Sequence, residues 1–355
     1  MGKVYFLPVN RFSEMDEFLA DAGVPGFLRT GDTVCLKIHF GASSHRNTVP
    51  PELLAPLASL LKEKKTQPCL VDTNVLYRGE RATTPGHLAV AWKNGYASLG
   101  IPVLIAGGLN AEDEIAVPVK GTHFAQVYLA REFPAWKTMI AVTHFKGHVA
   151  SGIGGTLKNL GMGCASRKGK FAQHASVTPQ VNKDRCVGCG VCAENCPADA
   201  IAVRRKKAHI DAKKCIGCGQ CVHACPKGAI DIPWSSTSSQ TFQERLAEYA
   251  AGVLSLYPGR FLGMNFLLNI SPDCDCIGHP REPLVDDIGL LVSTDPVALD
   301  QASADLVKKA PGRNAKAGED KFLKLRPDCD YRQQLAHAEK LGLGSRGYEL
   351  IEYDA

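Results

Sequence analysis

The sequence lacks any long run of hydrophobic residues. Although such residues make up 45% of the 355 positions, no window approaches the about 18 uninterrupted apolar residues that indicate a membrane-spanning helix. The segment that begins at Met1 has neither the apolar stretch nor the cleavage site of a signal peptide. Phe6 occupies the position where a myristoylation motif has Ser or Thr, and the C-terminus has no prenylation cysteine. We therefore expect a cytoplasmic protein with no membrane attachment.

Nucleotide-binding and nucleic-acid-binding motifs are also missing. Gly107-Gly108-Leu109 is too short for a dinucleotide-binding fingerprint, and the glycines of 152–155 lack the Gly-Lys-Ser/Thr step of a phosphate-binding loop. This argues against a self-contained nicotinamide-dependent dehydrogenase. There is no helix-turn-helix and no basic–aromatic pattern, so we expect no binding to nucleic acid.

Cysteine, by contrast, is abundant. The chain contains 14 cysteines, and eight of them lie between residues 186 and 225. In a cytoplasmic protein such a concentration indicates metal or redox chemistry. The sequence from 182 to 192 recurs at 211 to 221, and each half fits the spacing C-x2-C-x2-C-x3-C-P. The cysteines are Cys186, Cys189, Cys192 and Cys196 in the first half, and Cys215, Cys218, Cys221 and Cys225 in the second. This spacing is typical of bacterial ferredoxins with two [4Fe–4S] clusters.

The two halves are expected to share their ligands. Each Cys-Pro cysteine lies beyond the reach of its own loop, so the first cluster should take Cys225 and the second cluster should take Cys196. Thiolates suit iron and sulfide, and glycines at 188, 190, 217 and 219 permit the positive φ that a close approach needs. Zinc is the alternative, because paired C-x2-C motifs also bind it. Two oxidised clusters of charge about −2 each would cancel most of the formal net charge of +5, so that charge is no evidence for a nucleic-acid partner.

The rest of the chain alternates strand-like and helix-like segments, which predicts an α/β fold. Strands are expected at 33–39, 69–72, 102–106, 115–119, 138–143, 261–270 and 289–293. Helices are expected at 50–65, 84–99, 242–256 and 296–309, with Thr84 and Asp295 as N-caps. We predict a body of residues 1–180 and 234–355, with a ferredoxin-like α+β module inserted at 181–233. A separate C-terminal domain is the alternative.

The densest group of polar residues and glycines follows the strand predicted at 138–143. Its candidate catalytic residues are His144, Lys146, His148 and Lys158, and its candidate cofactor-binding residues are Gly152, Gly154 and Gly155. The histidines could be metal ligands or proton shuttles, and the glycine amides, which precede a helix, could bind an anion. Because sites in open α/β sheets lie beyond the carboxyl ends of strands, we interpret this group as functional. The alternative is a glycine-rich turn with a solvated basic flank.

Further cysteines fall outside the repeat. Cys164, Cys274 and Cys276 lie in predicted loops and could hold a third metal centre or a redox disulfide, or they could be ordinary loop cysteines. Cys35 and Cys69 lie in predicted strands, where we expect them to be small buried hydrophobic residues. The loop around Arg46 could bind a carboxylate or phosphate, or could simply be solvated.

Several of these motifs together resemble the domain-of-unknown-function family 362. They are His144-Phe-Lys-Gly-His148, the run Gly-Gly-Thr-Leu-Lys158-Asn-Leu-Gly-Met-Gly-Cys164, Asp-Cys274-Asp-Cys276 and Ser-x-Asp295-Pro-x-Ala-x-Asp300. Members of this family are iron–sulfur proteins that often carry an internal two-cluster ferredoxin module. The resemblance spans nearly the whole chain and implies a redox role in an anaerobic setting, but no particular reaction. It adds weight to a site that contains His144, Lys146, His148, Lys158, Cys164, Cys274 and Cys276.

We expect an oxidoreductase whose clusters exchange electrons with the α/β body, because a carrier alone needs only about 55 residues. The body could hold a small-molecule substrate, a flavin or a third metal, and the expected partner is a redox protein. The alternative is a ferredoxin-like electron carrier or a cluster-assembly protein with no substrate of its own. A third possibility, a racemase-like enzyme, rests on the similarity of His45-Arg46-Asn47-Thr48-Val49-Pro50 to a motif of nickel-dependent lactate racemases.

Overall fold

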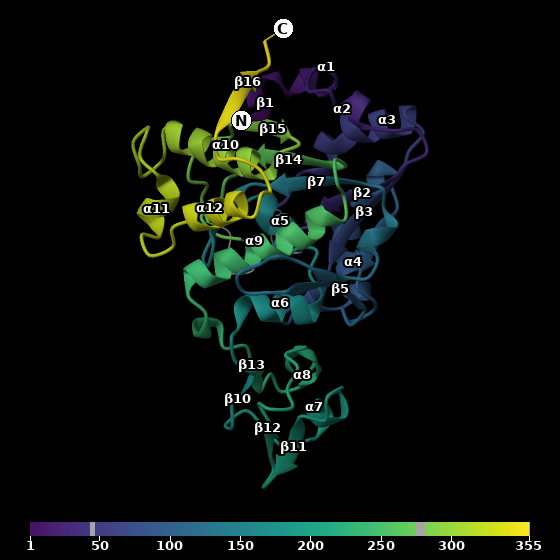
Figure 1. The fold of residues 1–355 in the computed structure, drawn as a ribbon, viewed down its shortest axis with the longest axis vertical. Coiled ribbons are helices and arrows are strands. Elements are labelled where there is room, and N and C mark those ends of the chain that lie inside the picture. The colour runs from purple at the N-terminus through teal and green to yellow at the C-terminus, as the bar shows by residue number, and fades with distance from the viewer. Residues whose placement is uncertain (43–46, 275–280, 355) are drawn as a thin grey trace.

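The computed structural model describes residues 1–42, 47–274 and 281–354, and an eight-stranded sheet runs through its body (Figure 1). The strands are β1 (Gly2–Pro8), β2 (Thr33–Ile38), β3 (Gln67–Thr73), β4 (Val103–Ala106), β7 (Thr138–His144), β14 (Phe261–Leu267), β15 (Gly289–Ser293) and β16 (Tyr348–Glu352). Their order is β16-β1-β15-β14-β7-β2-β3-β4. Within this sheet β15 is antiparallel to both neighbours, and the other pairs are parallel. The predicted α/β fold is confirmed, with a mainly parallel central sheet.

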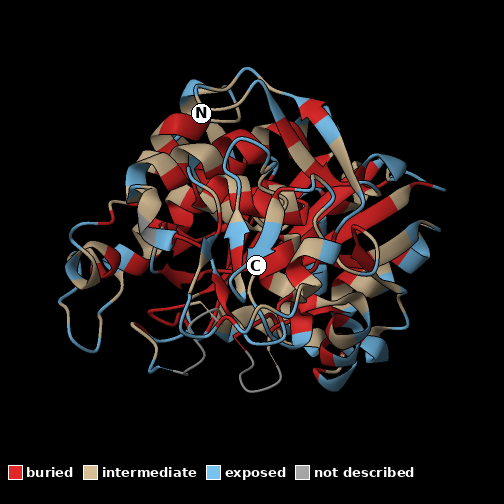
Figure 2. Ribbon diagram, turned by 90° about the horizontal axis from the view of Figure 1, so that it is seen from below, coloured by how far each residue is buried: buried red, intermediate tan, exposed pale blue. Residues whose placement is uncertain are grey.

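Alternate side chains of the central strands enter two hydrophobic cores. In β7, Met139 and Ala141 face one core, whereas Ile140 and Val142 face the other, as the two-residue period of a strand requires. The first core is completed by α5 (Thr156–Gly161), α9 (Ser239–Ser255), α10 (Pro296–Lys309) and α12 (Arg332–Lys340). The second is completed by α1 (Met15–Asp21), α2 (Val24–Phe27), α3 (Ala55–Glu63) and α4 (Thr84–Lys93). Figure 2 shows buried residues gathered in the interior of the molecule and exposed residues toward its periphery.

The remaining elements of the body are short. They are α6 (Arg167–His174), α11 (Lys321–Leu325), the hairpin of β5 (Glu114–Pro118) and β6 (Gln126–Ala130), and the hairpin of β8 (Lys146–His148) and β9 (Gly152–Gly154). The 3₁₀ helices are η1 (Val9–Glu14), η2 (Pro51–Leu54), η3 (Glu80–Ala82), η4 (Tyr96–Leu99), η5 (Phe133–Ala135) and η6 (Trp234–Ser236). Among the described residues, no helix has the length and hydropathy needed to span a bilayer.

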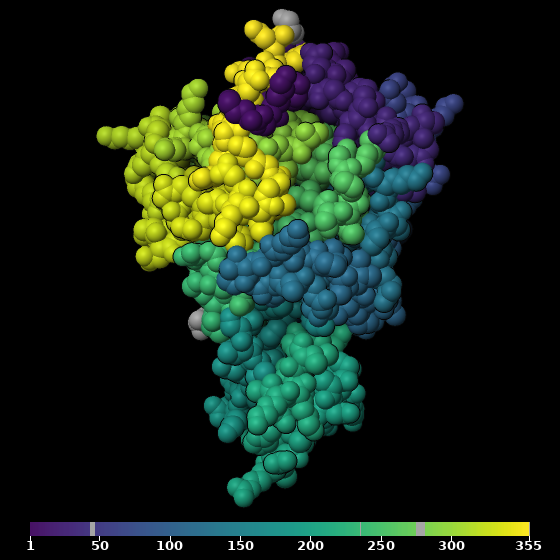
Figure 3. Space-filling model, in the orientation of Figure 1, coloured from purple at the N-terminus to yellow at the C-terminus, as the bar shows by residue number. Residues whose placement is uncertain are grey.

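Residues 180–232, called the cysteine unit below, form a small lobe at one end of the molecule (Figures 1 and 3). The unit contains the antiparallel pair of β10 (Gln180–Val181) with β13 (Ile230–Asp231) and the hairpin of β11 (Ile201–Arg204) and β12 (Lys207–Ile210). Its helices are α7 (Val191–Glu194) and α8 (Gln220–Ala224). Its core joins Cys186, Cys192, Cys221 and Cys225 to Leu76 and Phe171 of the body. The chain enters the unit after α6 and leaves it toward α9, so both connections run to the body.

Some elements differ from the prediction at their ends. The segment 84–99 is α-helical only to Lys93, because Gly95 takes a φ of 89° and the chain continues as η4. The N-cap of α4 is Thr83 rather than Thr84. The segment 50–65 begins with η2 before α3 starts. Asp295 caps α10 as predicted, accepting hydrogen bonds from the amides of Val297 and Ala298 at 2.9 Å each. The edge strand β16, which pairs with β1, was not predicted.

Candidate functional site

A cavity of about 580 Å³ lies where β2, β3 and β7 end. These parallel strands present their carboxyl ends at one edge of the sheet, which is where open α/β sheets bind ligands. The charged and imidazole side chains that line the cavity include Lys37, Asp72, Lys146, His148, Lys158 and Lys170. Apolar lining comes from residues such as Leu76, Met162 and Trp234. The cavity therefore combines several positive charges with apolar wall.

Asp72, at the end of β3, is the centre of a buried charge network. Its Oδ1 accepts hydrogen bonds from Lys37 Nζ at 3.0 Å and from the amide of Thr73 at 2.9 Å. Its Oδ2 lies 3.6 Å from His39 Nδ1 and 3.5 Å from His87 Nε2. Burial alone would raise the pKa of Asp72, but the charge of Lys37 and the two imidazoles hold this pKa well below its ordinary value. Asp72 is therefore a carboxylate across the physiological pH range.

His148 is held in one tautomer. Its Nδ1 accepts hydrogen bonds from the backbone amides of Ala150 and Ser151, each at 3.2 Å. An amide donates only, so Nδ1 carries the lone pair and Nε2 carries the proton. Burial, together with the positive charge of Lys158, holds the pKa of His148 well below its ordinary range. His148 is therefore a neutral hydrogen-bond donor through Nε2, which is not the tautomer that binds a metal through Nε2.

His144 and Lys146 follow on the same chain segment, and each is tied to a backbone carbonyl. His144 Nε2–H donates to the carbonyl oxygen of Leu268 at 2.6 Å. Lys146 Nζ donates to the carbonyl oxygen of Asn47 at 2.7 Å. Both residues line the cavity. Their carbonyl partners fix the two side chains against the cavity wall.

Two further lysines of the cavity differ in their surroundings. Lys170 is buried and donates to Thr73 Oγ1 at 2.5 Å and to the carbonyl oxygen of Ala165 at 2.6 Å. Burial lowers the pKa of Lys170 to about 7, so the amine can gain or lose a proton near neutral pH. Lys158, from α5, is partly exposed and has no hydrogen-bond acceptor among the residues that the structure describes. Its ammonium group can therefore bind a ligand.

The helix that follows the glycine-rich segment has its first two amides bound within the protein. Gly154 and Gly155 line the cavity, but the first two amides of α5, those of Thr156 and Leu157, donate to Asp300 at 2.7 and 2.9 Å. Asp300 also accepts from Asn265 Nδ2 at 2.8 Å and is fully buried. A Cβ on Gly155 would lie 2.3 Å from Asp300 Oδ1, so glycine is required there for this contact. The protein's own carboxylate occupies the helix terminus.

Replacing Asp300 with Ala is expected to destabilise the fold by about 3 kcal/mol, because two buried amides lose their acceptor. Burial raises the pKa of Asp300 to about 6. A carboxyl whose pKa is higher in the folded than in the unfolded state contributes most below the unfolded pKa, and its contribution falls as pH rises through the folded pKa. The loss measured by urea unfolding should therefore be larger at pH 5 than at pH 8. Asp295→Ala, which removes a more exposed helix cap, is the control and should cost about 1 kcal/mol. Equal losses for the two variants would contradict this account.

Cys164 and Cys274, outside the repeat, have different environments. Cys164 is fully buried in the core, where Lys37 and Lys170 are the positive charges that act on its thiol. Burial raises the pKa of Cys164 to about 12, which keeps it protonated. Cys274 lines the cavity beside His148. Cys276, His45 and Arg46 lie outside the described residues. Among the described residues, no group of three or more His, Cys, Asp or Glu side chains has the geometry of a single-ion site.

The eight cysteines of the repeat line two small cavities in the cysteine unit. The first cysteine set comprises Cys186, Cys189, Cys192 and Cys225, and the second comprises Cys196, Cys215, Cys218 and Cys221. Each set takes three residues from one half and one from the other, which is the grouping expected from the spacing. The amides of Ala208, Ala229 and Ala200 donate to the sulfurs of Cys186, Cys225 and Cys196 at 3.3 Å each. Gly188, Gly190, Gly217 and Gly219 all have a positive φ. Both sets are compatible with iron–sulfur clusters.

Sequence reasoning missed much of the charge network of the cavity. Lys37 and His39 stand in an otherwise apolar strand, and Asp72 ends the next strand along the sheet. A charged residue inside a buried strand, or at the carboxyl end of one, is a sequence feature that could have indicated these site residues. Lys170 gave no such signal, because its burial follows from the packing of α6 against the body.

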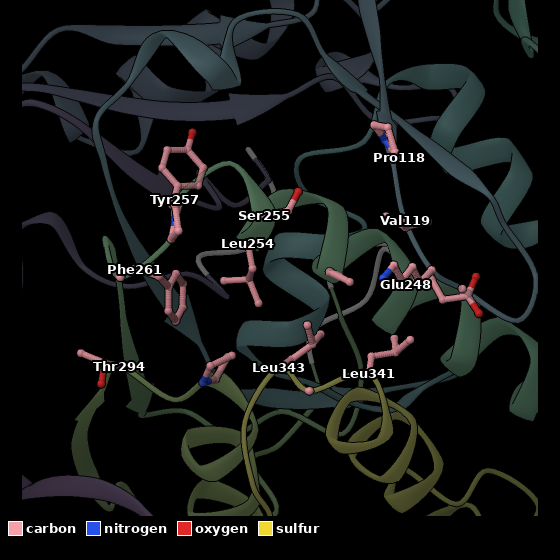
Figure 4. Close-up of a pocket in the computed structure, with 17 residues that line it drawn as sticks. Pro118, Val119, Glu248, Leu254, Ser255, Tyr257, Phe261, Thr294, Leu341 and Leu343 are labelled. Atoms are coloured by element: carbon pink, nitrogen blue, oxygen red, sulfur yellow. The ribbon is translucent and has the colours of Figure 1, made fainter.

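A second hollow of about 670 Å³ lies elsewhere on the body, near the start of β14 (Figure 4). Its wall includes the apolar side chains of Leu254, Phe261 and Leu343. Glu248 at its edge accepts hydrogen bonds from the amides of residues 122–124 and from His337 Nε2 at 3.1 Å. The carboxylate is thus used by the fold itself, so we place the candidate site in the cavity at the strand ends.

The fold and the two cysteine sets define a cysteine-rich α/β protein with a polar cavity at its strand ends. The chain belongs to the family described as Domain of unknown function (DUF362), whose model matches residues 34–305. The structure of the lactate racemase apoprotein from Thermoanaerobacterium thermosaccharolyticum is similar at 12% identity with a TM-score of 0.38. That match covers 76% of this chain and 51% of the racemase chain, and at this level it supports no inference about function. No curated protein matches the sequence significantly.

Proposed function

We propose that the protein is an iron–sulfur oxidoreductase whose two [4Fe–4S] clusters pass electrons to or from the cavity at the ends of β2, β3 and β7. The observation that carries this proposal is the grouping of the eight repeat cysteines into two sets of four, each drawn from both halves. A [4Fe–4S] cluster bound by each set would supply one-electron transfer. Amide donors to Cys186, Cys196 and Cys225 would help to set the reduction potentials, because hydrogen bonds to the sulfurs stabilise the more negative state.

The cavity residues support a role in binding and protonating a substrate. Lys158 would hold an anionic group, because its ammonium is directed to the cavity without an acceptor among the described residues. Lys170 would hold or release a proton near pH 7. The apolar wall near Leu76 and Trp234 suits the carbon part of a ligand. A small organic anion is therefore the proposed substrate class.

Iron, sulfide and flavin analysis of protein purified without oxygen tests the proposal, with EPR spectra after reduction. About eight iron and eight sulfide ions per chain are expected. Bound flavin or a further metal would place an additional redox centre in the body and would support an enzyme. Zinc without sulfide would overturn the redox function altogether.

The Lys158→Gln variant is expected to bind small organic anions about tenfold more weakly, because it loses a charged hydrogen bond. Suitable probes are benzoate and phenyl phosphate, with neutral benzyl alcohol for comparison. Ligand binding to the folded state raises Tm, so thermal unfolding measures the affinity. Lys168→Gln is the matched control, because Lys168 pairs with Glu114 and does not line the cavity. Equal Tm shifts with all three probes would favour an electron carrier without a substrate.

A further inference from the structure

The loop of the second cysteine set contacts the body beside the cavity. A Cβ on Gly219, between Cys218 and Cys221, would lie 3.1 Å from Leu76 Cδ1 and 3.5 Å from Arg167 Cγ. A Cβ on Gly217 would lie 3.5 Å from the ring of Phe171. Leu76 is shared, because it belongs to the core of the cysteine unit and also lines the cavity. In Figure 1, α8 of this set lies next to α6 of the body.

The loop of the first cysteine set contacts its own unit instead. A Cβ on Gly188 would lie 2.5 Å from the backbone of Lys206, in the turn between β11 and β12. Cys189 and Val187 of this loop are exposed, whereas the other three cysteines of the set are buried. The two sets therefore differ in the contacts of their loops: the first loop packs against its own unit, and the second packs against the body beside the cavity.

Arg167, the first residue of α6, places a buried positive charge at the junction with the second set. Only 1% of its surface is exposed, and its guanidinium donates to the carbonyl oxygen of Ala82 at 2.8 Å and to Gln220 Oε1 at 3.1 Å. Both acceptors are neutral, and Gln220 lies between two cysteines of the set. No carboxylate among the described residues forms an ion pair with Arg167; the negative groups that act on it are Glu112 and Cys218. Burial lowers its pKa only to about 10, so the guanidinium keeps its charge at neutral pH.

A buried charge is costly unless an opposite charge compensates it. A [4Fe–4S] cluster with four thiolates has a charge of about −2 when oxidised and gains one more negative charge on reduction. A nearby cation therefore stabilises the reduced form more than the oxidised form.

We propose that the second cysteine set holds the cluster through which electrons reach the cavity, and that Arg167 raises the reduction potential of this cluster. This inference rests on the proposed function. When an electron passes from the first cluster to the second, the first is oxidised and the second is reduced by one electron. Arg167 is a positioning residue in this scheme, because it contacts the loop of the second set and acts through its charge.

The test uses Cys189→Ser protein, in which the first cluster is expected to be lost and the signal of the second cluster can be followed alone. EPR-monitored redox titration should show that adding Arg167→Gln lowers the ratio of reduced to oxidised cluster about tenfold at a fixed potential, which is about 59 mV for a one-electron couple. Arg167→Lys keeps the charge and should change the ratio less than about threefold. Lys168→Gln removes a positive charge one residue away, where it pairs with Glu114, and should leave the ratio unchanged.

If Arg167→Gln does not fold, Gln220→Glu provides a second test of the same inference. Gln220 is only partly buried, and a carboxylate at this position would neutralise the guanidinium, so the ratio should again fall. If the ratio of reduced to oxidised cluster does not change in protein that contains a full second cluster, the inference is wrong but the proposed function stands. A shift seen only in Cys218→Ser protein, where the first cluster remains, would also overturn the inference. Protein without iron and sulfide would overturn the proposed function together with the inference.

Discussion

The Cys218→Ser variant, purified without oxygen, is expected to contain about four iron and four sulfide ions per chain instead of about eight of each. Serine oxygen is a harder ligand than thiolate and does not replace it well in an iron–sulfur site. Cys189→Ser should show the same loss, because Cys189 belongs to the other set of four. The matched control is Cys69→Ala: Cys69 lies in β3, packs against the main core and should leave the iron content unchanged. Full iron content in both serine variants would contradict the ligand assignment.

Because each half supplies one cysteine to the cluster of the other half, a more specific result is expected. Cys225 follows the second motif in sequence but lines the cavity of the first set, and Cys196 lines the cavity of the second. The EPR spectrum of Cys225→Ser should therefore resemble that of Cys189→Ser, and the spectrum of Cys196→Ser should resemble that of Cys218→Ser. The opposite pairing would mean that each half binds its own cluster. This experiment separates the two arrangements even though all four variants lose the same amount of iron.

The cysteine grouping could be predicted because the information is local. Three ligands of each set fall within seven residues, and the repeat itself indicates the partner half. The order of elements in the body was also accessible, since β2, β7 and α10 follow short apolar patterns with clear ends. The end of α4 could not be predicted, because the break depends on the positive φ of Gly95, which a helical pattern alone does not reveal.

The site was less accessible, because its contacts join distant parts of the chain. Asp72 meets Lys37 from the neighbouring strand, and Lys170 reaches Thr73 from α6. The role of Asp300 emerges only once α10 packs against α5, although the motif that contains it was recognised. The amides of Thr156 and Leu157, which follow the glycine segment, donate to a residue 144 and 143 positions away, and no local pattern indicates this partner. Burial of such charges is a property of the packed structure and leaves little trace in sequence.

The Asp72→Asn variant is expected to lose about 3–5 kcal/mol of stability, the largest loss we expect at a single cavity residue. The substitution keeps the shape of the side chain but removes the only carboxylate that pairs with Lys37 among the described residues. Lys37 is 1% exposed, and its other hydrogen-bond acceptor is the neutral Oδ1 of Asn159 at 2.8 Å. The loss therefore measures a buried charge left without its partner. Urea unfolding of the holoprotein, compared through the unfolding midpoints, is the measurement.

Two features separate this effect from a general packing defect. The double variant Lys37→Met/Asp72→Asn removes both charges, so it should be more stable than Asp72→Asn alone. The pKa of Asp72 is held below its ordinary value, so its stabilising effect is complete above the unfolded pKa and is lost only as pH falls through the folded pKa. The charge of Asp72 is therefore constant above pH 5. The difference between the wild type and Asp72→Asn should become smaller only as Lys170, whose pKa of about 7 is raised by Asp72, loses its proton. A difference that grows from pH 5 to pH 8 would contradict this account. A double variant as unstable as Asp72→Asn would show that the loss does not arise from the uncompensated charge of Lys37.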